Sequence, residues 1–389
     1  MSGAALPAPV PTPLRILYVF RAPVGGLFRN VFDVIKALSA RGHSIGLLCD
    51  SQTGGERGEQ LLAELAPLMP LGIHRLPMQR NPHWTDLPAL LKIRQLVKDH
   101  QVDVVHGHGA KGGLYARFPS LSRSAGRPIR CYTPHGGSLN YYPGSWSHRG
   151  FMLVEKMLEA STELFLFESR FITDRYAEFV GPTRKPVVIA LNGLHPNEFE
   201  PVVPDPDATD FLYVGEFREA KGIDTLVEAL FLLAADGVFP TITMVGSGPS
   251  ESRIRAMIRE RGLENSFRWR GVTPAEKAFR LGRVMVVPSR FESLPYIVLE
   301  AVAGQLPLIS THVGGIPEVL PRNHPYLIPP NDPTRLAGAL RHAFEQPFDS
   351  LKQTARQLSA EIQTRFTVPL MVETIEAAYR DVLARQSRG

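Results

Sequence analysis

The feature that most constrains the fold of this chain is a local pattern that occurs in both halves. A short apolar run leads into a glycine-containing loop, and an amphipathic segment follows. In the first half, the run Leu14–Phe20 precedes Gly25 and Gly26 and then a helical pattern over 28–40. The second half restarts with the run 211–214 and a loop that holds further glycines. Apolar strands that alternate with helices predict parallel sheets covered by helices, hence an α/β protein of two units with the same layout.

The chain of 389 residues is too long for one ordinary core and suits two domains. A proline-rich stretch, Pro201–Asp210, predicts the linker between them. We therefore expect a disordered lead-in over 1–13, a first domain over 14–198 and a second over 199–366. The apolar stripe after residue 367 predicts a closing helix.

Composition excludes several classes of protein. Hydrophobic residues make up 44% and charged residues 21%, an ordinary globular balance. The two cysteines, Cys49 and Cys131, end separate apolar runs, so a disulfide framework is not expected and a reducing, cytoplasmic location is. No apolar run is long enough to span a bilayer, and the first residues lack the pattern of a secretory signal.

Positive charge is concentrated in the first half. Residues 1–198 hold 22 Lys and Arg against 15 Asp and Glu, within a net charge of +5. Nucleic-acid binding is not expected, because no zinc-finger spacing, basic run or aromatic–basic motif is present. A peripheral contact with the anionic inner membrane surface is the preferred interpretation, with scattered solvated charges as the alternative. The candidate basic face consists of Lys111, Arg117, Arg123, Arg127, Arg130 and Arg149.

Two glutamates stand eight positions apart in the stretch Phe291–Glu300. A short apolar strand precedes them, and Pro295 suits the first turn of a helix. Glu292 is therefore expected on the loop and Glu300 in the helix, with roughly 8–12 Å between the carboxylates. That separation is too large for a shared proton and suits two ends of one polar ligand.

Two cations stand beside glycines at the start of the second half. Arg218 and Lys221 lie in the loop that follows the run 211–214, a setting suited to a diphosphate. The alternative is a pair of solvated surface charges. Gly246 and Gly248 end the next strand but lack the third glycine of a dinucleotide fingerprint, so NAD is disfavoured.

Histidines end two predicted strands of the first half, where ligands bind in parallel sheets. His106 is interpreted as a packing residue, whereas His108 and His135 are expected to face a cleft. As a metal pair His106 and His108 lack a third ligand nearby.

In their order and spacing, these residues resemble the family-4 retaining glycosyltransferases of the GT-B fold, in the group 1 glycosyl transferases. The resemblance covers about 14–383. Its motifs are Gly25-Gly26, His108, Thr133-Pro134-His135-Gly136, Asn192-Gly193, Gly215-x-x-Arg218-x-x-Lys221-Gly222, Gly246-Ser247-Gly248-Pro249, Pro288-Ser289, Glu292-x7-Glu300 and Val313–Glu318.

The resemblance implies two Rossmann-like domains with parallel sheets facing a central cleft, and a C-terminal helix over 367–389 that packs on the first domain. It implies transfer of a hexose from a nucleoside-diphosphate sugar to a saccharide or lipid-linked saccharide, in cell-surface polysaccharide synthesis. A UDP-sugar is favoured and GDP-mannose is next. The alternatives are a sugar-nucleotide epimerase of similar fold and a non-catalytic nucleotide-sugar or nucleic-acid binding protein.

The resemblance also implies roles for residues. Arg218 and Lys221 would hold the diphosphate in place of a metal ion, so no metal or other cofactor is expected. Glu300 would bind the ribose, Glu292 the transferred sugar, and His135 would lie near the reacting carbon. Donor binding is expected from Gly25, Gly26, Gly215, Arg218, Lys221, Gly246, Gly248, Glu292, Ser293, Leu294, Tyr296, Ile297 and Glu300, and acceptor binding from His108, Lys111 and His135. The loop Ser293-Leu294-Pro295-Tyr296 departs from the family's Gly-Phe-Gly-Leu, which bears on the donor sugar more than on the reaction class.

Overall fold

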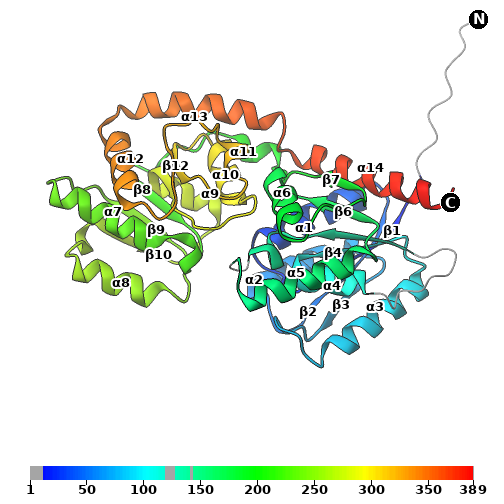
Figure 1. Ribbon diagram of the computed structural model, residues 1–389. Coiled ribbons are helices and arrows are strands. Elements are labelled where there is room, and N and C mark those ends of the chain that lie inside the picture. The colour runs from blue at the N-terminus through cyan, green and yellow to red at the C-terminus, as the bar shows by residue number, and fades with distance from the viewer. Residues whose placement is uncertain (1–11, 119–127, 141–142, 389) are drawn as a thin grey trace, which may run out of the picture.

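The chain folds into two lobes, each built on its own parallel sheet (Figure 1). In a computed structural model, residues 12–118, 128–140 and 143–388 are described. The first sheet has the order β3-β2-β1-β4-β5-β6-β7 and the second the order β10-β9-β8-β11-β12-β13. The change of sheet falls between residues 189 and 209.

The strands of the first sheet are β1 (Arg15–Val19), β2 (Ser44–Asp50), β3 (Ile73–Leu76), β4 (Val104–His108), β5 (Ile129–Thr133), β6 (Leu164–Phe167) and β7 (Val187–Ile189). Those of the second are β8 (Thr209–Val214), β9 (Ile242–Val245), β10 (Phe267–Arg270), β11 (Gly282–Val287), β12 (Leu308–Thr311) and β13 (Leu327–Ile328). β1 and β8 hold equivalent central places, each with later strands on both sides, so a switch point opens beside each of them.

Helices cover both sheets. The first lobe carries α1 (Gly25–Ala40), α2 (Gly55–Leu65), α3 (Asp86–His100), α4 (Gly109–Arg117), α5 (Trp146–Glu159) and α6 (Arg170–Phe179). The second carries α7 (Ile223–Ala235), α8 (Glu251–Glu260), α9 (Ala275–Ala278), α10 (Tyr296–Ala303), α11 (Ile316–Val319), α12 (Pro333–Glu345) and α13 (Phe348–Gln363). The last helix, α14 (Val368–Gln386), follows α13 and returns to the first lobe.

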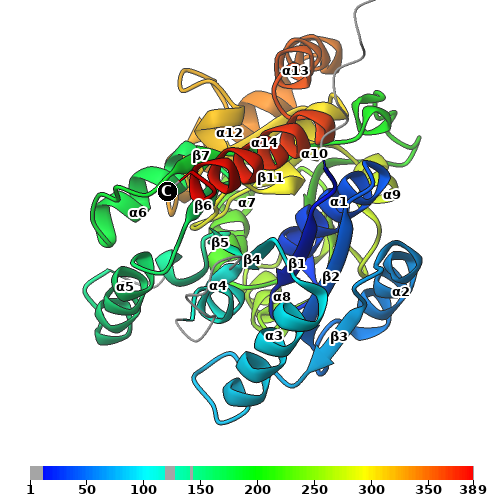
Figure 2. The same cartoon turned by 90° about the vertical axis from the view of Figure 1, so that its right-hand side faces the viewer.

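The return of α14 completes the core of the first lobe. This helix begins at Thr367, whose hydroxyl accepts a hydrogen bond from the Leu370 N–H. It packs on α1, β5 and β6, and Figure 2 shows it lying across the lobe. Its buried apolar residues join the core formed by the strands; they are Val368, Met371, Val372, Ile375, Ala378, Tyr379 and Val382. Each large side chain buried in this way contributes about 1.5–3 kcal/mol, so the helix is part of the lobe.

The chain crosses between the lobes twice, and the two crossings are hydrogen-bonded to each other. Leu194 and Thr367 form a parallel β-bridge. The Leu194 N–H donates to the Phe366 carbonyl, and the Val368 N–H donates to the Leu194 carbonyl, both at 3.0 Å. A side chain at Gly193 would lie 2.5 Å from the Thr367 backbone, so only glycine permits this approach. The two connections therefore run side by side as one hydrogen-bonded pair.

The predicted fold class is confirmed, with shifts at several boundaries. The helix after the first strand begins at Gly25 instead of Phe28. Pro295 is the residue before α10, not a member of its first turn. Residues 1–11 of the expected lead-in lie outside the described residues. No helix in the described ranges is both long and apolar enough to cross a bilayer.

Candidate active site

The two lobes meet around the stretch that contains Glu292 and Glu300. Asn192 accepts a hydrogen bond from Asn30 at 3.0 Å and donates to the Leu294 carbonyl at 2.8 Å, so it ties the first lobe to the loop before α10. On the other side of that loop, the Glu318 carboxylate accepts from the N–H groups of Arg170 and Phe171, at 3.0 and 2.8 Å. A residue of the second lobe therefore caps the N-terminus of α6 in the first lobe.

Glu292 lies on the loop between β11 and α10, as predicted, and is paired with a predicted cation. The Lys221 ammonium donates to Glu292 Oε1 at 2.6 Å, and the Ser289 hydroxyl donates to the same oxygen at 2.7 Å. Both charged side chains are mostly buried. Lys221 ends the short 3₁₀ helix η4 (Glu219–Lys221) that follows β8. The structure thus brings together two site residues that stand 71 positions apart.

Arg218 has a different environment from Lys221. Its side chain is about half exposed and pairs with an equally exposed Glu216 at 2.9 Å. Because exposed pairs of this kind are weak, the guanidinium remains able to change partner. The loop therefore offers one cation that is held in place and one that is free to move.

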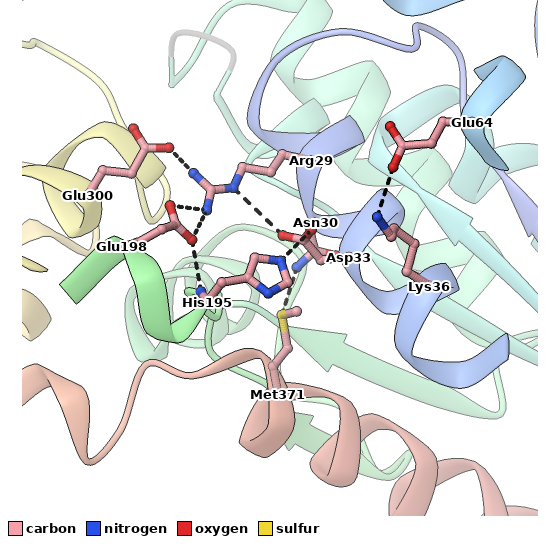
Figure 3. A network of polar contacts seen from close by, with 9 residues as sticks. All are labelled: Arg29, Asn30, Asp33, Lys36, Glu64, His195, Glu198, Glu300 and Met371. Atoms are coloured by element: carbon pink, nitrogen blue, oxygen red, sulfur yellow. Dashed lines mark hydrogen bonds and ion pairs between the residues drawn. The ribbon is translucent and has the colours of Figure 1, made fainter. Parts of the chain in front are cut away.

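Glu300 lies in α10, and its carboxylate forms an ion pair with an arginine that was not predicted from the sequence. Arg29 of α1 forms an ion pair with Glu300 Oε1 and donates to both carboxylate oxygens of Glu198 at 2.6 Å (Figure 3). Its guanidinium lies over the Tyr296 ring, 4.4 Å from the centroid. Arg29 therefore joins α1, the crossing segment and α10. The signal that could have identified it was its place four residues after Gly25, in the first turns of the helix that follows the glycine pair.

Two glycines of the predicted motifs allow loops to approach backbone. A side chain at Gly246, whose φ is +136°, would lie 2.0 Å from the Gly215 carbonyl oxygen, so the loops after β8 and β9 are in contact. Gly314 has a φ of +60°, and a side chain there would lie 2.1 Å from the Glu292 carbonyl oxygen. Only glycine fits at such positions. The loop that contains Gly314 thus packs directly on the Glu292 backbone.

The remaining residues of the Glu292–Glu300 stretch are mostly buried. Leu294 and Tyr296 belong to the core of the second lobe, and Ile297 packs against it. Tyr296 lies against Gly26, where an added Cβ would be 3.3 Å from its ring. Ser293 is nearer the first lobe, since its hydroxyl lies close to Glu168. The apolar side chains therefore fix the shape of the loop by packing in the core; they are Leu294, Tyr296 and Ile297. The polar side chains of the same stretch, Glu292, Ser293 and Glu300, remain candidates for ligand contact.

Three histidines form a row at the ends of β4 and β5, in which His106 and His108 are buried and His135 is partly exposed. His106 Nδ1 is 2.6 Å from the Tyr379 hydroxyl and its Nε2 is 2.8 Å from the Thr133 hydroxyl, which fits the packing role. His108 Nδ1 and His135 Nε2 share a hydrogen bond of 2.9 Å. Burial lowers the pKa of His106 and of His135 to about 3, and it lowers the pKa of His108 well below its usual value. The three rings are therefore neutral near pH 7.

Several basic residues have partners that the sequence did not predict. Lys111 is buried and pairs with Asp86 at 2.8 Å, so its ammonium already has an anionic partner. Arg117 is fully buried against Glu155, and Arg130 is buried against Glu163. The predicted basic face is wrong for these three residues, because ion pairing allowed their charges to be buried. Arg149 is exposed, and Arg123 and Arg127 lie outside the described residues.

Glu168, directly after β6, is a further polar residue at this place. Its carboxyl is buried, and it forms no ion pair with any cation among the described residues. Burial raises the pKa of Glu168 to about 7, while the nearby N–H groups of Glu168 and His135 and the Ser293 hydroxyl act in the opposite direction. The position at a predicted strand end was the available signal. The described part of the chain brings together no group of three or more His, Cys, Asp or Glu side chains suited to a metal ion.

Comparison with known proteins agrees with this architecture. Residues 25–193 match the model of the glycosyl transferase 4-like domain, and residues 208–346 match that of the glycosyl transferases group 1. Glycogen synthase of Mycobacterium tuberculosis is 22% identical over 395 residues, covering 94% of this chain and 92% of that protein. The amylovoran biosynthesis glycosyltransferase AmsK of Erwinia amylovora is 26% identical over 270 residues, covering 65% of this chain and 64% of AmsK.

Among solved structures, Anabaena Alr3699/HepE in complex with UDP and glucose superposes with a TM-score of 0.77 at 16% identity, covering 95% of this chain and all of that one. At this identity the likeness concerns the fold. The two family models fall on the two lobes in the order that the motifs predict. The chain therefore belongs to the group 1 glycosyltransferases with the GT-B fold.

Proposed function

We propose that this glycosyltransferase moves a hexose, with retention of anomeric configuration, from a nucleoside-diphosphate sugar to a saccharide or lipid-linked saccharide. The observation that carries the proposal is the pair formed by Lys221 and Glu292 at the contact between the lobes, with Arg218 exposed nearby. A UDP-sugar is the first candidate donor and GDP-mannose the second. Cell-surface polysaccharide synthesis is the proposed setting, supported by AmsK, whose name assigns it to amylovoran biosynthesis.

The charges of this site suit departure of a nucleoside diphosphate. Negative charge grows on the diphosphate as the bond to the sugar breaks, and fixed cations stabilise that state more than the ground state. Lys221 is already oriented by Glu292, so little rearrangement is needed for it to meet an anionic oxygen. Arg218 would exchange Glu216 for the diphosphate. These two cations would act in place of a metal ion, which is why we propose metal-independent transfer.

The two glutamates would hold opposite ends of the donor. Glu292 keeps its orientation through Lys221 and Ser289 and would accept hydrogen bonds from the transferred sugar's hydroxyls. Arg29 contacts Oε1 of Glu300, so Oε2 is the oxygen that would accept from the ribose. We assign Glu292 to positioning, with a nucleophilic role as the alternative.

The acceptor side would be formed by His135. Its Nε2 is engaged by His108, which leaves Nδ1 for a sugar hydroxyl. Because the pKa of His135 is lowered to about 3 by burial, it would act as a neutral hydrogen-bonding group and not as a cation. Lys111 is no longer proposed as an acceptor ligand, given its pairing with Asp86.

The first test is a screen of UDP-, GDP- and ADP-sugars for protection of the chain against heat. A donor present at about a hundred times its Kd stabilises the folded state by about 2.7 kcal/mol. With that donor, the anomeric configuration of the product is read from its proton NMR couplings, and turnover is measured with and without EDTA. Inversion, or loss of turnover in EDTA that added metal restores, would contradict the corresponding part of the proposal.

The second test concerns the site itself. Lys221→Ala and Glu292→Ala should each reduce kcat by at least about a hundredfold, in the range seen when groups that stabilise a transition state are removed. Lys277→Ala, which removes an exposed cation of the same lobe, is the matched control and should leave kcat unchanged. Turnover like that of the unmodified chain in both site variants would refute the assignment.

A further inference from the structure

The outward face of α5 carries apolar side chains where a surface helix normally carries polar ones. Trp146, Leu153 and Met157 are 87%, 63% and 68% exposed. Their spacing of seven and four residues places them within an arc of about 40° on the helix. Val154 is also exposed beside them. We call Trp146, Leu153, Val154 and Met157 the α5 stripe. In Figure 2, α5 lies at the edge of the first lobe.

The opposite face of α5 accounts for how the helix is held. Met152 and Leu158 are buried in the lobe. Glu155 is buried between them and accepts hydrogen bonds from Arg117 at 2.7 Å and from Ser138 at 2.6 Å. The α5 stripe is therefore not needed to attach the helix, and its exposure is a separate property of the sequence.

Positive charge flanks the α5 stripe on the same side. Arg149 is exposed, and its guanidinium lies 5.6 Å from the centre of the Trp146 ring. Lys156 is half exposed. The loop after α6 adds Arg184 and Lys185; the Lys185 ammonium contacts the Ala160 carbonyl at the end of α5.

The acids of α5 itself add little negative charge beside the α5 stripe. Of the two acids of α5, Glu155 is buried, and Glu159 is mostly covered and paired with Lys156 at 2.7 Å. An apolar stripe containing tryptophan, bordered by Lys and Arg, is the pattern of a helix that lies in the interface of an anionic bilayer.

We infer that the α5 stripe is the surface by which this protein binds an anionic lipid bilayer, with α5 lying parallel to the membrane plane. The choice of a lipid bilayer as the partner rests on the proposed function in one respect, because a lipid-linked acceptor would be presented at the membrane surface. The chain from the histidine row to α5 is short, since Ser145, the N-cap of α5, stands ten residues after His135. Ser138, three residues after His135, also donates to Glu155 of α5 at 2.6 Å, so docking of α5 would hold the proposed acceptor side close to the lipid.

A second copy of the chain fits this surface less well than lipid does. In a two-fold contact, identical patches face each other. The Arg149 side chains of the two copies would then meet, with Glu155 buried and Glu159 already paired with Lys156. Anionic headgroups satisfy the same cations without that repulsion.

The test is flotation of the full chain with vesicles of phosphatidylcholine, with and without phosphatidylglycerol. We expect flotation only with phosphatidylglycerol, and loss of it at high salt. Leu153→Gln with Met157→Gln should weaken binding about tenfold or more, because two large apolar side chains no longer enter the interface. The matched control is Phe239→Gln, which removes an exposed aromatic side chain from the second lobe and should float unchanged.

A second readout locates the contact. Trp146 fluorescence should shift to the blue and be quenched by brominated acyl chains, and Trp146→Phe should remove that quenching. The inference would be overturned if the chain floated with neither kind of vesicle, or if the Leu153/Met157 variant floated as well as the unmodified chain. It would also be overturned by a concentration-dependent dimer that this variant abolishes. These experiments need no donor sugar. A chain that binds vesicles but transfers nothing would refute the proposed function and leave the surface intact.

Discussion

At the scale of single residues, the site is dominated by charges whose partners lie far away in the sequence. Arg29 reaches Glu198 and Glu300 across 169 and 271 positions, and Lys221 reaches Glu292 across 71. Burial of one charge is possible because its partner is buried with it. Glu168 is the exception, since its carboxyl is buried and unpaired among the described residues.

Glu168 should make stability depend on pH. Burial raises its pKa from the usual 4.5 to about 7, so the folded state binds a proton that the unfolded state has released between those values. The contribution of Glu168 to the free energy of unfolding is therefore fully present below about pH 4.5. It is lost as the pH rises through about 7, and the total loss is about 3 kcal/mol. Glu168→Gln should remove that loss, so urea unfolding would show the variant more stable at about pH 8 and the difference gone at about pH 4.5.

The control for this comparison is Glu56→Gln, which replaces an exposed carboxylate of α2. It should leave the pH dependence unchanged. If Glu168→Gln lost stability at both pH values alike, the carboxyl would be making hydrogen bonds that its present geometry does not provide.

At the scale of elements, two helices are held in place by residues that are distant in the sequence. The N-terminus of α6 is capped by its own Ser169 and by Glu318 of the second lobe. Among the described helices, only α14 follows the second lobe in the sequence while its buried face packs in the first lobe. Local propensity explains how each helix starts, whereas tertiary contacts explain why it stays in place.

The buried face of α14 should be costly to truncate. Ile375→Ala should lower the free energy of unfolding by about 2–4 kcal/mol, because it leaves a cavity in the core of the first lobe. Leu370→Ala on the same helix is the control; it is 42% exposed, and its effect should stay below about 0.5 kcal/mol. Equal losses in the two variants, measured by denaturant unfolding, would mean that α14 does not pack as described.

The cap provided by Glu318 should be measurable as a contact between lobes. Glu318→Ala leaves the N–H groups of Arg170 and Phe171 without their acceptor, at a cost of about 1 kcal/mol. Hydrogen exchange should increase at the first turn of α6 and leave the first turn of α5, which has the separate cap Ser145, unchanged. Unchanged exchange at α6 would show that the cap has no energetic weight.

At the scale of the whole molecule, Arg29 is the point where α1, the crossing segment and α10 are joined. Arg29→Ala frees Glu300 and removes the contact over Tyr296, so the ribose end of the donor site loses its orientation. We expect the KM for the donor to rise about tenfold with a smaller change in kcat, the pattern of lost ground-state binding. Lys36→Ala, later in the same helix, is the control, since it removes an exposed pair with Glu64. An unchanged KM for the Arg29 variant would separate this residue from the donor site.

The sequence predicted the two-sheet architecture because alternation of apolar strands, glycine loops and helices is a local signal that survives folding. It also placed Glu292 on a loop and Glu300 in a helix. It could not predict Arg29 as a partner of Glu300, since nothing local relates residues so far apart. It misplaced Arg117 and Arg130 on a surface, because a charge in a sequence is assigned to solvent until its buried partner is known.

The return of α14 to the first lobe has a consequence for how the protein is made. A ribosome releases the residues of the first lobe well before those of α14, because the whole second lobe is synthesised in between. Until then, the side chains that α14 covers on α1, β5 and β6 have no partner. The first lobe therefore cannot complete its core until the last helix has been synthesised, and until then part of that core is exposed to water. Exposure of that kind favours aggregation and chaperone binding, so a stalled or truncated chain would be the aggregation-prone form.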